Sequence, residues 1–301
     1  MTAVSGSPAL LAPQPAGTGR VTIAASAVLP LAGPSGPYEV LLAWPDTPPP
    51  ADGYPVLYLL DGNADFGTAV DSMRAQSRQP ASTGVGPGVV VGLAYPGEAT
   101  IDLVRRTRDY TPEVPDGRLG LRPNGEAWPP SGGAQAFRGF LVEVVREAVA
   151  ACLPIDRRRQ ALFGHSFGGL FVLDTLLEMP GAFSAYIASS PSLWWGENLL
   201  PERLAARARP DPLPRVHVRI SAGSLEETPR PGIAERLPAY PLWLRRNRMI
   251  ANAEAFAARL RTDGFDAGFH LFGGENHGSV VPAALSRALA LAFSLDLREP
   301  S

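Results

Sequence analysis

The sequence predicts an α/β fold with a mostly parallel central sheet flanked by helices and with antiparallel strands at its N-terminal end. Two continuous apolar runs, at residues 55–60 and 89–94, are typical of fully buried strands. Apolar residues at helical spacing between 134 and 152 indicate an amphipathic helix, and strand and helix patterns alternate after it. Such alternation favours parallel strands joined by helices that pack on both faces of the sheet.

The expected elements follow one another in a regular order. Alternating apolar and small residues at 21–29 and 38–44 predict the antiparallel opening strands. Residues 96–133 are expected to form a long loop beside the functional site. After the helix at 134–152, the expected elements are a strand entering residue 164, a helix ending before Pro180, strands at 185–189 and 216–220, a helix at 242–261, a strand at 269–272 and a helix at 281–295. We expect residues 1–19 to be a disordered or loosely attached lead-in and residues 20–301 to be a single domain.

Composition excludes several classes of function. The 301 residues carry a net charge of −2, so no basic field favours nucleic acid or an anionic membrane surface. All 27 basic residues are arginine, and without lysine neither a Schiff base nor a serine–lysine mechanism is available. No apolar run is long enough to predict a membrane span, and residues 1–19 lack the pattern of a signal peptide. The lone Cys152 requires no oxidising compartment, so we expect a cytoplasmic protein.

A short apolar run ends in Gly164-His165-Ser166-Phe167-Gly168, and a helical pattern follows directly. Gly-x-Ser-x-Gly between a strand and a helix is the nucleophile elbow of an α/β-hydrolase, a tight turn that exposes its serine above the sheet. The turn leaves room only for small residues two positions before and after the serine, which accounts for Gly164 and Gly168. The sequence therefore predicts an α/β-hydrolase fold with Ser166 as the nucleophile.

A serine hydroxyl needs a base within hydrogen-bond reach, and the chain has four histidines. His165 adjoins the serine and is expected to point away from the cleft, while His217 and His270 fall inside expected strands. His277 lies in the loop between the last strand and the last helix, where the carboxyl ends of parallel strands gather functional groups. Elimination therefore favours His277 as the base.

The orienting acid of an α/β-hydrolase stands between the serine and the histidine in the chain. Glu226 and Glu227 both follow the strand expected at 216–220. We prefer Glu226 because it stands three residues after Gly223, which is the usual spacing of this turn. Glu227 stays open as the alternative.

Acyl transfer also requires two N–H donors for the oxyanion that develops on the substrate. One is expected to be the amide of Phe167, directly after the nucleophile. The second is expected in the loop after the strand at 55–60, where the amide of Asn63 is the candidate and Asp61 is expected to hold the loop. An ordinary turn at these residues is the alternative. We expect neither a metal ion nor a cofactor.

Several motifs occur together in the order found in one family. They are residues 54–63 (YPVLYLLDGN), 108–112 (RDYTP), 132–134 (GGA), 162–171 (LFGHSFGGLF), 189–195 (SSPSLWW) and 274–280 (GENHGSV). With these motifs the chain resembles the "putative esterase" family of α/β-hydrolases, and within it the enterobactin and salmochelin siderophore esterases. The resemblance extends over about residues 20–295.

The resemblance implies that Ser166 and His277 act as nucleophile and base. It leaves the acid open, because some siderophore esterases look like serine–histidine dyads. It also implies hydrolysis of the serine trilactone of catecholate siderophores through an acyl-enzyme. A ferric tris-catecholate is trianionic, so its site is expected to offer arginines and flat apolar surface. The candidates are Arg105, Arg106, Arg108, Trp194 and Trp195, with solvated charge as the alternative for the arginines and core packing for the tryptophans.

Two other functions stay open alongside this hypothesis. The fold also suits a general carboxylesterase for other acyl esters. A non-catalytic α/β-hydrolase that binds a ligand is the third candidate, but such a protein has no need of Ser166, His277 and the acidic pair together. In each case the expected partner is a small molecule, an ester in the first two, and neither nucleic acid nor a membrane.

Overall fold

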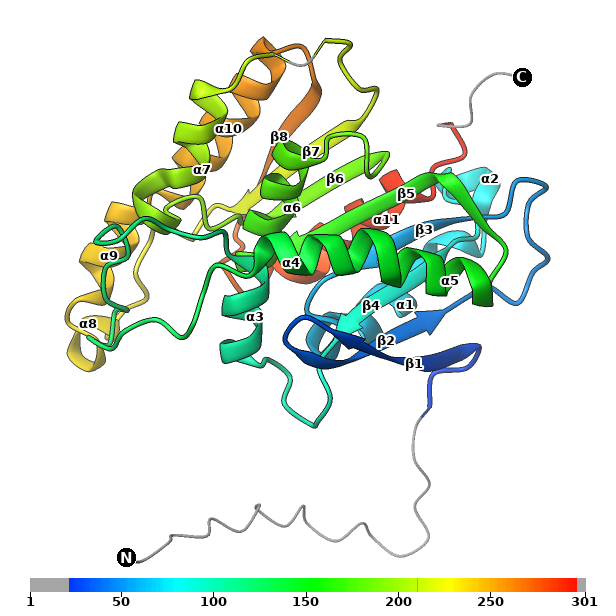
Figure 1. Cartoon of the computed structure of the whole chain (residues 1–301), viewed down its shortest axis with the longest axis horizontal. Coiled ribbons are helices and arrows are strands. Elements are labelled where there is room, and N and C mark those ends of the chain that lie inside the picture. The colour runs from blue at the N-terminus through cyan, green and yellow to red at the C-terminus, as the bar shows by residue number, and fades with distance from the viewer. Residues whose placement is uncertain (1–21, 210, 297–301) are drawn as a thin grey trace, which may run out of the picture.

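The computed structural model describes residues 22–209 and 211–296, so the lead-in expected at residues 1–19 lies outside the described part of the chain. An eight-stranded sheet in the order β1-β2-β4-β3-β5-β6-β7-β8 forms its centre (Figure 1). The β1–β2 and β2–β4 pairs are antiparallel, and all other neighbouring pairs are parallel, which confirms the expected architecture. The strands are β1 (Ser26–Gly33), β2 (Gly36–Ala43), β3 (Tyr54–Leu59), β4 (Val89–Ala94), β5 (Ile155–His165), β6 (Ala185–Ser189), β7 (His217–Gly223) and β8 (Asp266–Phe272).

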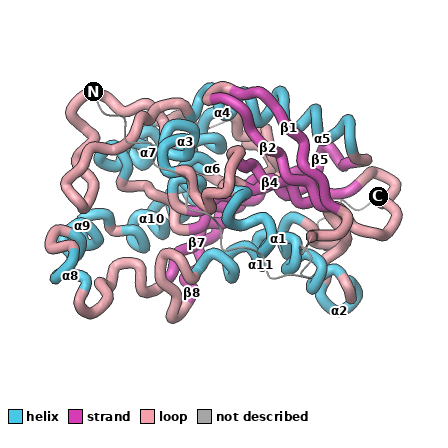
Figure 2. The backbone as a smooth tube through the Cα atoms, turned by 90° about the horizontal axis from the view of Figure 1, so that it is seen from below, coloured by secondary structure: helices cyan, strands magenta, loops and turns pink. Residues whose placement is uncertain are grey.

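Helices cover both faces of the sheet, as Figure 2 shows from below. One face carries α1 (Gly62–Ser77) and α11 (Val280–Ala292), which pack against each other. The opposite face carries α4 (Ala134–Gly139), the π-helical stretch η1 (Phe140–Val145), α5 (Arg146–Cys152), α6 (Phe167–Glu178) and α10 (Met249–Thr262). The other helices are α2 (Pro80–Thr83), α3 (Leu103–Tyr110), α7 (Trp195–Ala206), α8 (Ile233–Arg236) and α9 (Tyr240–Asn247). Within the described residues, no helix combines the length and the apolar composition that crossing a bilayer requires.

Each face of the sheet has its own apolar core. Phe66 and Leu285 belong to the core beneath α1 and α11, and Phe137, Phe171 and Phe256 belong to the larger core on the opposite face. Because a fully buried side chain of this size contributes about 1.5–3 kcal/mol, these two layers hold the central strands rigidly in place. The strands are therefore a firm base for the loops at their ends.

Several elements differ from the sequence prediction. Helices α1 and α7 were not expected, and the helix expected at 134–152 contains the π-helical stretch η1. The single helix expected at 242–261 is two helices, α9 and α10, because Arg248 between them adopts a left-handed backbone with φ of 45°. Helix α3 lies inside the loop expected at 96–133. Its buried residues include Arg106, Thr107 and Asp109, so the face that packs inward is polar and gives no apolar periodicity.

The parallel strands place six loops at one edge of the sheet. These loops follow the carboxyl ends of β3, β4, β5, β6, β7 and β8, and functional groups of open α/β sheets gather at this edge. Ser166 follows β5 directly, Glu226 follows β7, and His277 stands between β8 and α11. The topology therefore brings together residues that are far apart in the sequence.

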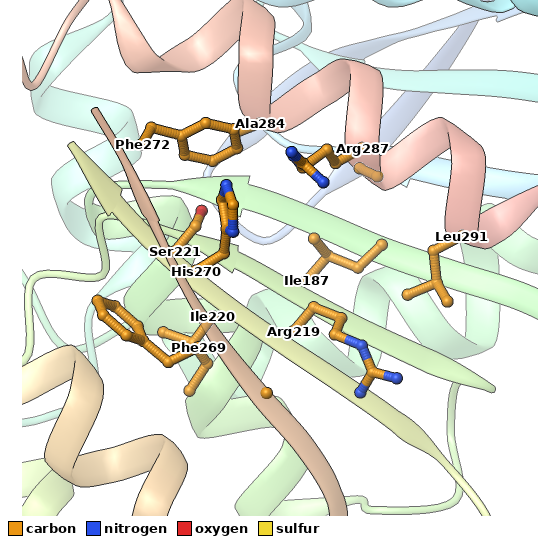
Figure 3. A pocket seen from close by; sticks show the side chains of 12 residues that line it. Ile187, Arg219, Ile220, Ser221, Phe269, His270, Phe272, Ala284, Arg287 and Leu291 are labelled. Atoms are coloured by element: carbon orange, nitrogen blue, oxygen red, sulfur yellow. The ribbon is translucent and has the colours of Figure 1, made fainter. Parts of the chain in front are cut away.

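A separate hollow of about 370 Å³ lies between α11 and strands β7 and β8 (Figure 3). Ile187 and Leu291 line it together with Arg219, Arg287 and His270. His270 is exposed there, whereas the sequence predicted a packed strand residue. Partial desolvation of its ring by the lining residues and the positive charge of Arg287 lower the pKa of His270.

Candidate active site

Ser166 occupies a strained turn between β5 and α6. Its backbone has φ of 60° and ψ of −115°, a conformation that residues with a side chain rarely adopt. A Cβ at Gly164 would lie 2.4 Å from backbone atoms of Gly168, and one at Gly169 would lie 2.9 Å from the carbonyl oxygen of Ser189. Glycine is therefore required where β5 and α6 cross, and the turn has the geometry of a nucleophile elbow.

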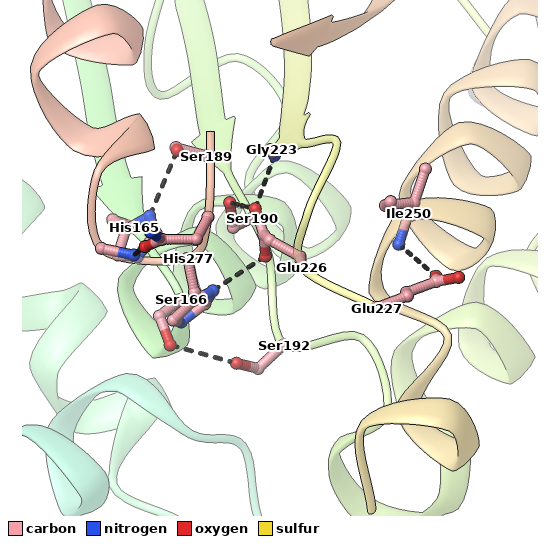
Figure 4. Close-up of polar contacts among 12 residues, drawn as sticks. His165, Ser166, Ser189, Ser190, Ser192, Gly223, Glu226, Glu227, Ile250 and His277 are labelled. Carbon is pink, nitrogen blue, oxygen red and sulfur yellow. Dashed lines mark hydrogen bonds and ion pairs between the residues drawn. The ribbon is translucent and has the colours of Figure 1, made fainter. Parts of the chain in front are cut away.

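Glu226 and His277 form a hydrogen-bonded pair next to this turn (Figure 4). The distance from His277 Nδ1 to Glu226 Oε2 is 2.8 Å, and Glu226 is only 3% exposed. The other carboxylate oxygen, Oε1, accepts hydrogen bonds from Ser190 Oγ at 2.5 Å and from the Gly223 amide at 2.6 Å. Burial by itself would raise the pKa of Glu226, but the bonds from His277, Ser190 and Gly223 outweigh it and hold that pKa below its usual value.

Glu227, the alternative acid, points to a different element. Its Oε1 accepts hydrogen bonds from the amides of Ile250 and Ala251, at 2.9 and 3.4 Å, at the beginning of α10. A carboxylate at this position satisfies free N–H groups of the helix and complements its dipole. The structure therefore brings Glu226, and not Glu227, to His277.

His165 lies against the base instead of pointing away from the cleft. The ring centroids of His165 and His277 are 4.5 Å apart, and His165 Nδ1 lies 3.2 Å from Ser189 Oγ. Burial and the charge of His277 lower the pKa of His165 well below its usual range, so its ring is neutral at neutral pH. Because His165 immediately precedes Ser166, this contact places His277 beside the turn.

Three serines at the end of β6 and in the loop after it each contact a different member of this group. Ser189 contacts His165 and Ser190 donates to Glu226, while Ser192 Oγ lies 3.4 Å from Ser166 Oγ. All three are buried, and Ser190 has a left-handed backbone with φ of 46°. From the sequence, this segment supports only the family resemblance. The three serines stand close together where a strand ends, before the acidic residues in the chain. This position was the signal that could have identified them.

The loop expected to supply an oxyanion donor lies against the start of α6. A Cβ at Gly168 would be 3.7 Å from the Asp61 carboxylate, so the two loops are in close proximity. The Asn63 side chain donates to the carbonyl oxygen of Tyr95 and accepts from its amide, both at 2.8 Å. These bonds fix the backbone at Asn63. The amide of Phe167, at the first position of α6, has no acceptor within the helix.

Helix α3 holds this loop through a buried ion pair. Arg106 donates from Nε and from a terminal nitrogen to the two carboxylate oxygens of Asp61, both at 2.9 Å, and both side chains are buried. The Asp61 amide also donates to the hydroxyl of Tyr110 at 3.2 Å. Two nitrogens of the Arg106 guanidinium are bound to Asp61, which favours a structural role for Arg106 over the predicted substrate contact. The expected loop-holding position of Asp61 agrees with this geometry.

The two other arginines of α3 differ from each other. The guanidinium of Arg105 lies 4.7 Å from the ring centroid of Tyr38 and 4.4 Å from that of Tyr95, so it too packs internally and replaces the predicted substrate contact with a cation–π contact. Arg108 is exposed, and its carbonyl oxygen accepts from the Gly133 amide at 2.8 Å. A substrate contact by the Arg108 side chain stays a prediction.

The two predicted tryptophans also have different environments. Trp195 is fully buried and packs on Phe167 with 5.0 Å between ring centroids, so the core-packing alternative holds for it. Trp194 is half-buried and lies 5.6 Å from Trp128 and 5.1 Å from Trp243. Sequence reasoning missed Trp128 and Trp243. Trp128 is an isolated tryptophan in the long segment between α3 and α4, Trp243 lies on α9, and only the fold brings them to Trp194.

The chain matches the family described as "Putative esterase" over residues 33–286. The ferri-bacillibactin esterase BesA of Bacillus subtilis is 37% identical over 265 residues, 86% of either chain. The apo-salmochelin esterase of Escherichia coli is 38% identical over 187 residues, which are 62% of this chain and 56% of that one. Among solved structures, the siderophore hydrolase EstA of Aspergillus nidulans superposes with a TM-score of 0.79 at 29% identity, covering 96% of this chain and 99% of that one.

These similarities agree with the fold and the elbow described above. The family match covers most of the chain, and the two full-length similarities extend over nearly the whole sheet and its loops. The predicted resemblance to siderophore esterases and the α/β-hydrolase fold are both confirmed. The chain belongs to the "Putative esterase" family and is a hydrolase that acts on ester bonds.

Proposed function

We propose that this protein is a serine esterase that opens the trilactone ring of catecholate siderophores through an acyl-enzyme. Ser166 is the nucleophile, His277 the general base and Glu226 the acid that orients it. The observation that carries this proposal is the buried Glu226–His277 pair beside the strained turn of Ser166. A ligand-binding module without catalysis would have no use for a carboxylate held ionised against a histidine.

The hydrogen-bond partners assign the proton positions. Because ionised Glu226 can only accept, His277 Nδ1 carries the proton and Nε2 is free to take one from Ser166. Ser166 Oγ then bonds to the ester carbonyl carbon, and the amides of Phe167 and Asn63 stabilise the negative oxygen. Collapse of this intermediate releases the alcohol, which receives the proton from His277. Water activated by His277 releases the acid and restores Ser166.

Ser192 defines the resting position of the nucleophile. The 3.4 Å contact between Ser166 Oγ and Ser192 Oγ is long for a hydroxyl hydrogen bond, so little energy is needed to break it. Attack requires Ser166 Oγ to turn toward His277, and such catalytic hydrogen bonds often tighten only when substrate is bound. We therefore assign Ser192 a positioning role.

The substrate class rests on the relatives and on the surface beside Ser166. Relatives named as siderophore esterases match this chain over most of its length, and half-buried tryptophans lie next to the elbow. Aromatic faces of this kind favour aryl groups such as catechols. A small-molecule ester is thus the proposed partner, and the cytoplasm is the proposed location.

The test uses the purified full-length chain and Ser166→Ala. We expect the wild type to cleave p-nitrophenyl butyrate and to convert enterobactin to its linear and monomeric products, followed by mass spectrometry. Ser166→Ala should lose about 10⁴-fold or more of kcat on both. An organophosphate should add one adduct to the wild type and to Ser192→Ala, and none to Ser166→Ala. Cleavage of the simple ester alone would favour a general carboxylesterase, and undiminished activity of Ser166→Ala would exclude the serine mechanism.

A further inference from the structure

An aromatic wall leads from the nucleophile to the segment 228–248, which contains α8 and α9. Phe167, the residue after the nucleophile, has its ring centroid 6.1 Å from that of Trp194. Trp194 lies 5.1 Å from Trp243 of α9, and Trp243 stacks on Tyr240 at 5.7 Å with 17° between the ring planes. The side chains of Trp194, Trp243 and Tyr240 are half-buried, so each keeps part of its ring accessible. The wall therefore offers flat surface continuous with the site of attack.

The segment 228–248 is also strongly basic. It holds five arginines and one glutamate, in a chain whose net charge is −2. All five arginines are exposed, and no ion pair joins any of them to another of the residues that the structure describes. By contrast, two arginines of the loop that carries Trp128 are paired with glutamates. The unpaired arginines are Arg230, Arg236, Arg245, Arg246 and Arg248.

Helix α9 brings this charge to the active site rather than to a distant face. Burial and the negative charge of Glu226 raise the pKa of Tyr240, so the start of α9 is within electrostatic reach of the catalytic acid. Arg246 stands three residues after Trp243 and so shares its side of the helix. Figures 1 and 2 show α8 and α9 together at one end of the molecule, next to the loop before α4. We call the segment 228–248 the basic rim.

Arginines beside aromatic rings suit one kind of group in particular, an aryl ring that carries negative oxygens. The guanidinium pairs with the oxygens while the ring stacks on tryptophan. A catechol is uncharged at neutral pH, but it loses both protons when it chelates a ferric ion, and three such groups leave the complex trianionic. Iron-loaded and iron-free forms of one siderophore therefore differ most in negative charge, which is the property that the arginines of the basic rim would bind.

We propose that the basic rim and its aromatic wall bind the anionic aryl groups of an iron-loaded catecholate siderophore, so that this enzyme favours the ferric ester over the iron-free one. This inference rests on the proposed function. Family membership does not decide between the ferric and the iron-free substrate, because one relative is named for a ferri-siderophore and another for an apo-siderophore. In this chain the preference for the ferric form follows from the arginines of the basic rim, which have no ion-pair partner within the described residues.

Binding is measured in the Ser166→Ala background, so that no turnover occurs. The readout is quenching of tryptophan fluorescence by ferric and by iron-free enterobactin. We expect ferric enterobactin to bind at least about tenfold more tightly than the iron-free form. Its affinity should fall when NaCl is raised from 50 to 500 mM. Arg245→Gln with Arg246→Gln should weaken the ferric complex by about tenfold and leave the iron-free one within twofold.

The matched control removes two exposed arginines elsewhere, with Arg158→Gln and Arg261→Gln. It has the same net charge as the rim variant, and we expect its affinity for ferric enterobactin to stay within twofold of the parent. Equal affinities of the rim and control variants, or equal affinities for the two forms of the siderophore, would overturn the inference. The proposed function is tested separately, by cleavage in the wild type. If neither form is cleaved, that function fails, and the binding assay still decides what the rim recognises.

Discussion

Two regions around Ser166 treat polar groups in opposite ways. We call Ser190, Glu226 and residues 61–63 at the beginning of α1 the catalytic floor, and there buried polar groups are held by hydrogen bonds from several elements. In the basic rim, charged groups are exposed and have no ion pairs within the described part of the chain. The floor is therefore prepared before substrate arrives, whereas the rim leaves its charges available to a ligand.

This difference separates the proposed site of chemistry, in the floor, from the proposed site of substrate selectivity, in the rim. A group buried with all its partners cannot move far, so it contributes equally to every ester that reaches Ser166. An exposed arginine changes the binding free energy of a neutral ester little, and it contributes to binding only when the ligand carries negative charge. Floor variants should therefore lower kcat on all esters or destabilise the fold, while rim variants should affect the affinity for one ligand class.

The largest expected effect separates two adjacent glutamates. Glu226→Gln keeps the size of the side chain but removes the charge that orients and stabilises His277, so kcat should fall by about 10³-fold on simple esters and trilactones alike. Glu227→Gln is the matched control. Its amide oxygen can still accept from the Ile250 amide at the start of α10, so kcat should stay within about twofold. Steady-state kinetics on p-nitrophenyl butyrate give both values.

Equal, near-wild-type activity of the two variants would contradict the assignment of Glu226 to the catalytic floor. It would mean that Ser166 and His277 act as a dyad and that the hydrogen bonds around Glu226 serve only the fold. A loss confined to Glu227→Gln would assign the acid to the neighbouring residue.

The next effect concerns the ion pair inside the floor. Arg106→Met leaves the Asp61 carboxylate buried without its cation, and the free energy of unfolding should fall by about 3 kcal/mol in urea titrations. Adding Asp61→Asn removes the unpaired charge and keeps a residue that tolerates the left-handed φ of 54°, so the double variant should recover part of the loss. Arg105→Met, one residue earlier and half-buried, should cost less. If Arg106→Met instead raised KM with unchanged stability, the result would favour the predicted substrate contact of Arg106 over the structural role.

The sequence was sufficient to predict the sheet, the elbow and the histidine, because each carries a local signature. Apolar runs mark buried strands, and Gly164 reflects the steric demand of a turn in which its Cβ would lie 2.4 Å from backbone. A Cβ at Gly168 would meet its nearest neighbouring side chain only at 3.4 Å, so the structure shows the expected steric demand at Gly164 alone. His277 could be found by elimination among only four histidines. The preference for Glu226 over Glu227 agrees with the observed contacts, although its catalytic role stays a proposal.

The partners of the arginines could not be predicted, because they depend on contacts between distant segments. Arg106 reaches Asp61 across 45 positions of the chain, and nothing near either residue in the sequence marks the pair. The same holds for Trp243, which meets Trp194 only after β7 and its loop have been placed. The family resemblance led to the expectation of arginines beside flat apolar surface, and which of these residues lie together could be found only from the fold.

The smallest effect tests a carboxylate that the floor does not hold. Asp65 lies in the first turn of α1, and burial together with the charge of Asp61 raises its pKa to about 7, well above its value in an unfolded chain. Between these two pKa values the folded state keeps a proton that the unfolded state has lost, so stability falls as the pH rises from about 4 to 7.

Asp65→Asn removes this titration. At pH 8 the variant should gain about 2 kcal/mol of unfolding free energy, roughly half of what the full shift would give, because solvent screens a side chain that is only partly buried. At pH 4 the gain should vanish, since Asp65 is then largely protonated in the folded protein. Urea titrations at the two pH values measure both, with Asp71→Asn, an exposed site on the same helix, as the control. A gain that is equal at both pH values would show that Asp65 acts through packing or helix propensity, and that the floor tolerates a neighbouring charge without cost.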